Sequence, residues 1–307
     1  MFWKIPGLGK IGRIGIAPPC PEPGREGLAI ALIVRNEARH VREWAEFHAR
    51  AGVRRFLVYD NGCTDATVPI LRETLGDAVT VVPWRQVFSD AVMGREIHNQ
   101  VLAYAHAASN FGGAFRWMAF IDVDEFLIPT RAGGLPEALA EAGDCVNISL
   151  PWHMFGHSGH VEPPEAGVLR SYLRRAADPM SDVRGVRAFK CVVDPCALVR
   201  VGVHVMETGD GTTCDDQGRR VAMKDREKRG FYSVRNIQLN HYYARSEAEL
   251  AEKIGRGPNL VAKSPEYERK VRRTVANIEA DEVEDLAALD YLARTGQLTS
   301  MEFPLKD

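Results

Sequence analysis

The sequence predicts an α/β protein with a doubly wound, mostly parallel sheet and helices on both faces. Two observations indicate this fold class. Apolar runs of strand length alternate with segments of helical periodicity, a pattern typical of βαβ units. The first run, residues 28–34, is apolar throughout, as expected of a strand buried on both faces of a parallel sheet. A smaller mixed region and C-terminal helices are expected to follow this sheet.

The first half of the chain supplies the strand–helix repeats. The predicted elements are strands at 28–34, 54–60, 79–82 and 116–122, which alternate with helices at 39–52, 64–76 and 90–108. In the first helix, Val41 and Trp44 recur at helical spacing and Gly52 supplies the stop. Thr64 or Asp65 is expected to cap the second helix.

The second half is less regular. Its predicted elements are a strand that starts at 147 and becomes a loop by 160, strands at 189–195 and 197–205, a polar surface loop at 209–230, a strand at 237–245, and mostly amphipathic helix at 264–293. The strands on either side of Pro195 can form a hairpin. Ser246 and Glu249 have the spacing of a capping box, which predicts that a helix begins there.

The composition excludes several classes of protein. The 39 Lys and Arg residues nearly balance 41 Asp and Glu residues, whereas proteins that bind duplex nucleic acid usually carry a basic surplus. The longest apolar runs are far shorter than the ~18 residues of a membrane span, and the N-terminus lacks the apolar core of a signal peptide. We therefore expect a cytoplasmic protein with at most peripheral contact to the inner face of the membrane. The apolar and basic residues that suit such contact are Phe2, Trp3, Lys4, Ile5, Lys10 and Arg13, but a leader without this role is the favoured interpretation.

The 6 cysteines form no C-x-x-C pair and have no matching histidine spacing. Disulfide frameworks are typical of small secreted domains, not of a chain of this length without a secretion signal. We therefore expect reduced cysteines that serve mainly in packing.

The clearest chemical signal is the run Asp122-Val123-Asp124-Glu125, which follows the apolar strand at 116–122. Alternate residues of a strand point to the same side, so Asp122 and Asp124 are expected to converge. Two carboxylates this close repel unless a cation or a proton lies between them. Mg²⁺ and Mn²⁺ prefer such oxygen ligands and fill their other positions with water and phosphate oxygens. The alternative is a pair of carboxylates that caps a helix.

Other polar residues stand where a doubly wound sheet binds its ligands, beyond the carboxyl ends of its strands. Arg35 and Asn36 follow the first strand, and Asp60 ends the second, although turn chemistry alone explains the sequence around Asp60. His241, or else His204, is a candidate metal ligand through its neutral imidazole. The candidate cations for a diphosphate are Arg85, Lys190, Arg245 and Lys253.

The sequence contains no P-loop, no Gly-rich dinucleotide fingerprint after the first strand, no G-x-S-x-G elbow and no H-E-x-x-H motif. These absences argue against the common kinase, dinucleotide-dependent, serine-hydrolase and zinc-protease classes.

Four motifs in order resemble the glycosyltransferases of the GT-A superfamily, most of all family 92 and its bacterial family-2-like relatives. The motifs are LAIALIVRNEARHVREWAEFHARAGVRRFLVYDNGCTD, FIDVDEFLIP, WHMFGHSGH and LNHYYARS, which extend over about residues 28–255. The resemblance implies a nucleotide-sugar donor, expected to be a UDP-sugar, a bound Mn²⁺ or Mg²⁺, and inversion at the anomeric carbon. It also implies a carbohydrate acceptor.

The resemblance, together with the strand-end positions and the chemistry of the residues, gives the expected roles. The nucleotide-sugar contacts are expected to be Arg35, Asn36, Asp60, Arg85, Asp122 and Lys190, and the metal ligands Asp122, Asp124 and His241. The expected acceptor contacts are Trp152, Phe155, Gly156, His157 and His160, and the candidate bases are Glu125, His157 and His160. A sugar-phosphate nucleotidyltransferase and a non-catalytic nucleotide-sugar or glycan-binding protein are the alternatives.

These roles divide the chain into three parts. Residues 1–26 are expected to form an irregular leader, residues 27–245 a single catalytic domain, and residues 246–307 a C-terminal helical segment. Within the domain, residues 27–130 are expected to bind the nucleotide and residues 131–245 to face the acceptor.

Overall fold

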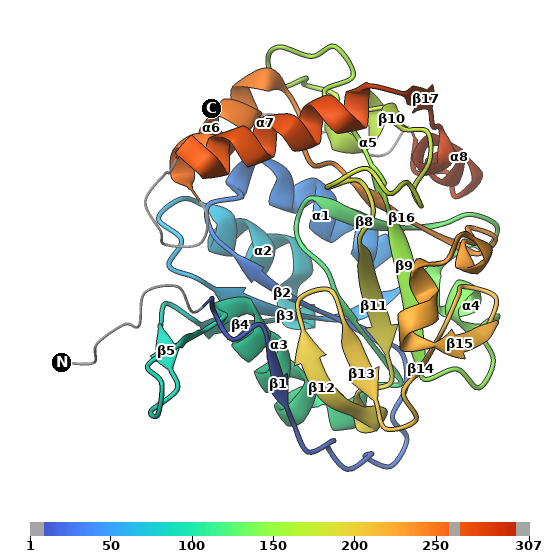
Figure 1. Ribbon diagram of the computed structural model, residues 1–307. Coiled ribbons are helices and arrows are strands. Elements are labelled where there is room, and N and C mark those ends of the chain that lie inside the picture. The colour runs from blue at the N-terminus through green and yellow to red at the C-terminus, as the bar shows by residue number, and fades with distance from the viewer. Residues whose placement is uncertain (1–8, 258–264, 299–307) are drawn as a thin grey trace.

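The computed structural model describes residues 9–257 and 265–298, and its centre is a ten-stranded sheet (Figure 1). Its main path runs β15-β14-β9-β11-β7-β2-β3-β4, and β16 pairs with both β8 and β9. The strands are β2 (Leu28–Val34), β3 (Val53–Asp60), β4 (Val79–Pro83), β7 (Trp117–Phe120), β8 (Glu125–Pro129), β9 (Asn147–Met154), β11 (Phe189–Val193), β14 (Thr212–Cys214), β15 (Arg220–Ala222) and β16 (Ile237–His241).

The strands β7, β2, β3 and β4 are parallel, and helices cover both of their faces. On one face, Leu28, Ile30 and Leu32 of β2 pack in a core with α1 (Ala38–Arg50) and α2 (Thr67–Leu75). On the other face, Ala29 and Ala31 pack against α3 (Asn99–Phe111). The predicted fold class is thus confirmed, because β2 is buried on both faces.

The other half of the sheet is mixed. β11 runs antiparallel between β7 and β9, while β16 is parallel to β9 and antiparallel to β8. Three small sheets lie around the large one: β1 (Arg13–Gly15) with β12 (Leu198–Gly202) and β13 (Met206–Thr208), β10 (Arg174–Ala176) with β17 (Glu282–Glu284), and β5 (Phe88–Ser89) with β6 (Glu96–Ile97).

The remaining helices are short or C-terminal. They are α4 (Leu135–Ala140), α5 (Val168–Ser171), α6 (Glu247–Arg256), α7 (Pro265–Glu279) and α8 (Ala287–Arg294), with 3₁₀ turns at Gly76–Ala78, Gly112–Ala114, Pro195–Ala197, Met223–Glu227 and Arg229–Phe231. The capping box of Ser246 and Glu249 starts α6 as predicted. The predicted helix at 264–293 is instead two helices separated by β17, and residue 264 lies outside the described residues.

Four other local predictions are wrong. The helix expected at 90–108 begins only at Asn99, because the Asp90 carboxylate accepts hydrogen bonds from three following N–H groups and holds a hairpin turn. The strands on either side of Pro195 form no hairpin, since β11 and β12 belong to different sheets. The supposed loop at 209–230 contributes β14 and β15 to the large sheet. The second helix, α2, begins at Thr67 with Ala66 as its N-cap, so neither Thr64 nor Asp65 occupies that position.

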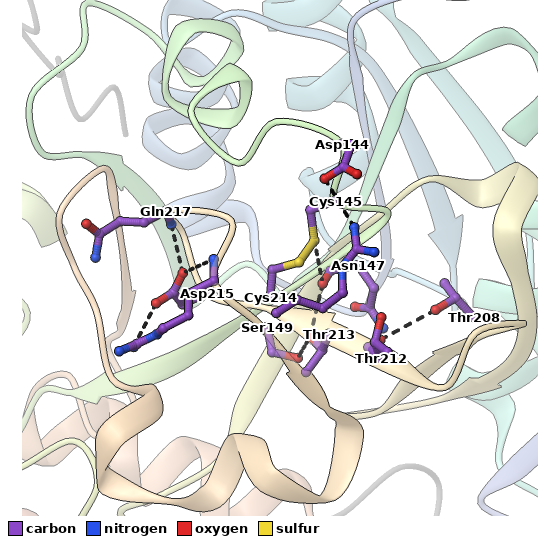
Figure 2. Close-up of a disulfide and its surroundings, with 12 residues drawn as sticks. Asp144, Cys145, Asn147, Ser149, Thr208, Thr212, Thr213, Cys214, Asp215 and Gln217 are labelled. Atoms are coloured by element: carbon purple, nitrogen blue, oxygen red, sulfur yellow. Dashed lines mark hydrogen bonds and ion pairs between the residues drawn. A yellow bond between two sulfur atoms is a disulfide. The ribbon is translucent and has the colours of Figure 1, made fainter.

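A disulfide joins Cys145 and Cys214, so the expectation of reduced cysteines is wrong for this pair (Figure 2). Cys145 lies just before β9, and Cys214 ends β14, which pairs with β9 in parallel. This pairing brings the two Cα atoms to 6.4 Å, within the range that a disulfide spans. Spacing along the sequence gave no sign of it, because 69 positions separate the two residues. The other cysteines are free thiols.

We expect the Cys145→Ser/Cys214→Ser variant to unfold more easily by about 2–4 kcal/mol, because the cross-link restricts the unfolded chain. Denaturant titration of oxidised protein measures this, with Cys20→Ser as the control for an exposed free thiol. Thiol counting in denaturant should give four reactive groups before reduction and six after it. Six reactive groups before reduction would show that the bond does not form.

His48, on the buried face of α1, links this helix to the sheet. Its Nδ1 lies 2.8 Å from the Trp44 carbonyl, and its Nε2 lies 3.3 Å from the Leu127 N–H. Only a neutral ring protonated at Nδ1 both donates to the carbonyl and accepts from the N–H. Complete burial accordingly lowers the pKa of His48 to about 3.

In the folded chain His48 therefore stays neutral between about pH 6.5 and pH 3, whereas in the unfolded chain it binds a proton below pH 6.5. The stability that depends on neutral His48 should be complete above pH 6.5 and fall by roughly 2 kcal/mol by pH 5. We expect His48→Gln to be less stable at pH 7 but to lose less stability over this interval, as measured by urea unfolding at both pH values. An identical pH dependence in both proteins would contradict this role.

The described helices include none with the length and apolar content that crossing a bilayer requires.

Candidate active site

Two adjoining cavities open where the parallel strands end. The first, here called the strand-end cavity, has a volume of about 600 Å³ and lies beyond the carboxyl ends of β2, β3 and β7. The second, the helix-end cavity, has about 560 Å³ and lies between the start of α1 and α6. Asn36, Glu37, Asp124, Tyr243 and Lys253 line both cavities.

Asp122 is held in place by contacts to both of its carboxylate oxygens. Oδ1 accepts from Gln100 at 2.8 Å and from the Tyr104 hydroxyl at 3.4 Å, both on α3. Oδ2 accepts from Lys190 Nζ at 2.8 Å. The Asp122 side chain is 34% exposed, so its outer edge still faces the strand-end cavity.

Lys190 lies beneath the run Asp122–Glu125, and its side chain is 1% exposed. Its Nζ is 2.8 Å from Asp122 and 3.3 Å from Glu125 Oε2. Although burial alone lowers the pKa of Lys190, the two carboxylates raise it well above its ordinary value. Glu125 is completely buried, and burial raises its pKa to about 8. Lys190 is thus a permanent internal cation and does not face the cavity.

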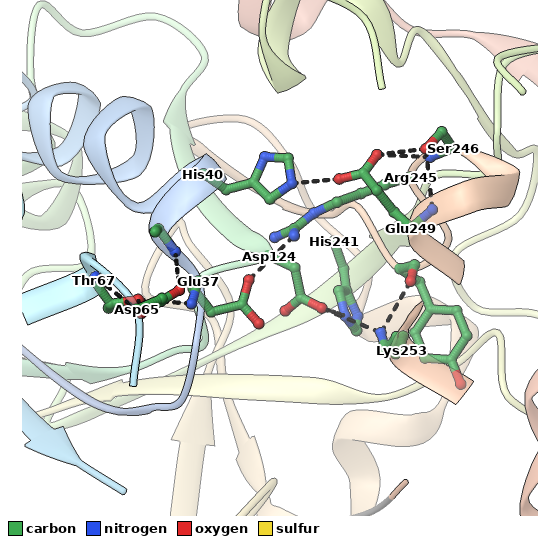
Figure 3. Close-up of polar contacts among 12 residues, drawn as sticks. Glu37, His40, Asp65, Thr67, Asp124, His241, Arg245, Ser246, Glu249 and Lys253 are labelled. Carbon is green, nitrogen blue, oxygen red and sulfur yellow. Dashed lines mark hydrogen bonds and ion pairs between the residues drawn. The ribbon is translucent and has the colours of Figure 1, made fainter. Parts of the chain in front are cut away.

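Asp124 points the other way, toward late parts of the chain (Figure 3). Its Oδ2 lies 3.4 Å from His241 Nε2 and 3.4 Å from Lys253 Nζ. Burial opposes ionisation, but His241 and Lys253 lower the pKa of Asp124 well below its ordinary value. Asp122 and Asp124 therefore do not converge as the strand pattern predicted. The chain turns between them, with the Glu125 N–H donating to the Asp122 carbonyl, so strand alternation does not apply.

The residues around Asp124 suit a divalent metal ion in part. Asp124 supplies a hard carboxylate oxygen and His241 an imidazole nitrogen, a pair that suits Mn²⁺ or Mg²⁺. Burial lowers the pKa of His241, which favours the neutral ring that a metal requires, and its buried Nδ1 has no hydrogen-bond partner. Among residues 9–257 and 265–298, however, no three Asp, Glu, His or Cys side chains converge on one point. Asp122 is directed at Lys190 instead.

The helix-end cavity is lined by a network of charges (Figure 3). Arg245 is 9% exposed, has a positive φ of 52°, and donates to Glu37 Oε2 at 3.2 Å. Glu249 of α6 contacts His40 of α1 and accepts from the Tyr172 hydroxyl at 2.9 Å. These contacts tie the start of α1 to the start of α6 across the cavity.

Several predicted site residues meet in the strand-end cavity: Arg35, Asn36, Asp122, Asp124, Trp152, His204 and His241 line it. Trp152 separates the two candidate histidines. Its ring lies 4.3 Å from the His241 ring and 5.1 Å, edge-on, from the His204 ring, measured between centroids. Of the two, only His241 contacts Asp124.

Other predicted nucleotide contacts serve the local structure. Asp60 accepts from the N–H groups of Gly62 and Cys63, at 3.1 and 2.8 Å, and so holds the turn after β3. Arg85 is exposed and lies against Gly62, where an added Cβ would come within 2.9 Å of its Cδ. Neither residue lines the two cavities.

The loop expected to face the acceptor lies apart from both cavities after Trp152. Phe155 is 1% exposed and packs on Tyr242, and Gly156 lies against Glu279. His157 Nδ1 is 2.6 Å from Glu279 of α7, and His160 Nε2 is 3.1 Å from the Ser171 carbonyl. This loop therefore joins the sheet to α5 and α7.

Sequence reasoning missed Glu37, Gln100 and Tyr243, which line the strand-end cavity. Glu37 ends the polar run after β2, which marks a strand end where ligands bind. Gln100 precedes Tyr104 by one helical turn, so both reach Asp122, but nothing in the sequence pairs them with it.

A doubly wound α/β chain with carboxylates in a cavity at its strand ends has the architecture of a nucleotide-binding enzyme. The particular family follows from comparison of sequences. The model of glycosyltransferase family 92 matches residues 30–280, and the chain belongs to this family.

Two curated relatives show the extent of the match. A glycosyltransferase family 92 protein of Ricinus communis is 30% identical over 200 residues, which are 61% of this chain and 33% of the relative. One of Oryza sativa subsp. japonica is 29% identical over 178 residues, 56% of this chain and 27% of the relative. The chain thus spans about a third or less of the length of these relatives.

Solved structures are less similar. Glucosyl-3-phosphoglycerate synthase from Mycobacterium tuberculosis, in complex with Mn²⁺, UDP and glucosyl-3-phosphoglycerate, is 16% identical with a TM-score of 0.32, over 57% of this chain and 58% of that chain. Mannosyl-3-phosphoglycerate synthase from Rubrobacter xylanophilus is 16% identical with a TM-score of 0.30, over 92% and 78%. Scores of this size carry no conclusion about the ligands of the present chain.

We expect Lys190→Met to lower the free energy of unfolding by about 3–5 kcal/mol, because it leaves Asp122 and the buried Glu125 without their cation. Chemical denaturation at pH 7 measures the change. The Lys190→Met/Asp122→Asn variant is the matched control. It also removes the charge of the Asp122 carboxylate that Lys190 neutralises and should recover part of the loss. An equal loss in both variants would mean that packing, not charge, is the cause.

Proposed function

We propose that the chain transfers a sugar from a nucleotide-sugar donor, a UDP-sugar, to a hydroxyl group of a glycan or similar acceptor, with inversion at the anomeric carbon. The observation that carries this proposal is the placement of Asp122 and Asp124 in the strand-end cavity, with His241 beside Asp124. Family membership supports the class of reaction. The cavity is of a size that suits a small-molecule ligand.

In this proposal the donor occupies the strand-end cavity. Arg35 and Asn36 lie at its nucleoside side, beyond the end of β2. Asp124 and His241 would hold Mn²⁺ or Mg²⁺, with the outer edge of Asp122 nearby. When bound, the ion supplies positive charge that stabilises the leaving diphosphate. Lys253, which now contacts Asp124 and the Tyr243 carbonyl, adds a second positive charge at the same wall.

The acceptor occupies the helix-end cavity, which meets the donor cavity at Glu37 and Asp124. An inverting displacement requires a base within hydrogen-bond reach of the acceptor hydroxyl. Glu125, His157 and His160 line neither cavity, whereas Glu37 lines both. The Arg245 guanidinium donates to Glu37 Oε2 at 3.2 Å and so holds this carboxylate at the junction of the two cavities. We therefore propose Glu37 as the base.

We expect Asp124→Ala and His241→Ala to abolish both sugar transfer and metal-dependent nucleotide binding while the chain remains folded. Donor hydrolysis measured with a set of UDP- and GDP-sugars identifies the donor, and calorimetry with UDP, with and without Mn²⁺, measures binding. Asp144→Ala is the control, since that side chain is 95% exposed and pairs with Arg220 outside both cavities. Glu37→Gln should lower kcat at least about a hundredfold and leave nucleotide binding unchanged.

Unchanged activity in Asp124→Ala would refute the proposal. Nucleotide binding that depends on Asp124, without turnover of any donor, would favour a non-catalytic binding protein instead.

A further inference from the structure

The hairpin of β5 and β6 exposes four large apolar side chains, Val87 and Phe88 at its start and Val92 and Met93 at its tip. Val87, Phe88, Val92 and Met93 are 62%, 48%, 93% and 45% exposed. Within the part of the chain that the structure describes, no other stretch of similar length exposes four large apolar side chains. The hairpin also stands out from the body of the molecule (Figure 1). Single exposed apolar residues are ordinary, but a cluster on a projecting element marks an interaction site.

Hydrogen bonds hold the tip of the hairpin in a defined turn. The Asp90 carboxylate accepts from the N–H groups of Val92, Met93 and Arg95, at 3.1, 2.8 and 2.9 Å, and Gly94 takes a positive φ of 63°. At the base, the Ile97 backbone bridges to Ile11. The apolar side chains are thus presented to the outside by hydrogen bonds that do not depend on a hydrophobic core.

Three basic residues lie in this hairpin or next to its base. Lys10 and Arg85 are exposed, and Arg95 Nε donates to the Gly9 carbonyl at 3.1 Å. Glu96 and Lys10 pair with each other and Asp90 is bound by the turn, so Arg85 and Arg95 supply the remaining positive charge. Apolar side chains within a basic rim have the chemistry that binds an anionic lipid surface.

We propose that the β5–β6 hairpin docks the chain on an anionic phospholipid bilayer, with Val92 and Met93 entering the interfacial layer. A second copy of the chain fits this surface less well, because a two-fold contact would place one basic rim against another. The hairpin leads directly into His98, which lines the strand-end cavity. Docking therefore holds this cavity beside the bilayer. If the proposed transferase function holds, the acceptor is membrane-borne.

The test is cosedimentation of the full chain with vesicles of phosphatidylcholine, alone or with about 30% phosphatidylglycerol. We expect binding to the anionic vesicles that weakens with added salt. The variant Val92→Ser/Met93→Ser should bind at least about tenfold more weakly. Val161→Ser/Val183→Ser is the matched control, because it replaces two apolar residues that are 58% and 46% exposed elsewhere, and it should bind as the unmodified chain does.

Absence of vesicle binding, or equal binding by the tip and control variants, would overturn the proposal. So would loss of self-association in the tip variant without change in vesicle binding, measured by light scattering, since it would assign the tip to a second copy. None of these measurements uses a sugar donor. Failure of the docking proposal is therefore distinct from failure of the proposed transferase function, which donor hydrolysis in solution tests separately.

Discussion

The buried ammonium of Lys190 is the interaction on which the geometry of the site depends. Asp122 and Glu125 lie three residues apart in a turn and would repel each other in a dry interior. β11 places Lys190 between them because it runs antiparallel between β7 and β9. Its charge is balanced by these carboxylates, so Asp122 is fixed toward the interior. Asp124 is then the carboxylate of the 122–125 run that faces His241. The two aspartates therefore point to different partners, Asp122 to Lys190 and Asp124 to His241.

Much of the fold could be predicted because buried strands and helix faces are apolar, and this pattern is visible in the sequence. β2 is apolar in every residue since both of its faces are covered, and the Ser246 capping box is a local feature of four residues. That Asp122 and Asp124 lie at the end of a buried strand followed in the same way, whereas the expected convergence of their side chains did not. The prediction of helix at 90–98 was wrong because apolar spacing alone does not reveal that the Asp90 carboxylate accepts hydrogen bonds from three backbone N–H groups.

The parts of the site that could not be predicted depend on contacts between distant segments. Lys190 is a single basic residue in an apolar strand, and nothing local shows that it will lie under Asp122. Similarly, β14 and β15 are short and polar, so their pairing and the Cys145–Cys214 bond arise only from the arrangement of the sheet. The aromatic and histidine-rich loop after Trp152 had a suggestive composition, yet its contacts to α5 and α7 are structural.

The position of β16 has a consequence for how the site comes into being. β16 pairs on one side with β8, where His241 stands opposite Glu125, and on the other side with β9. His241 therefore reaches Asp124 only after a late segment has paired with two earlier strands. Contacts of such high sequence separation form slowly, because the chain entropy of closing the loop must be overcome first. The parallel strands β2, β3, β4 and β7 can thus pair before β16 is synthesised, but His241 joins Asp124 only after β16 has been added to β8 and β9.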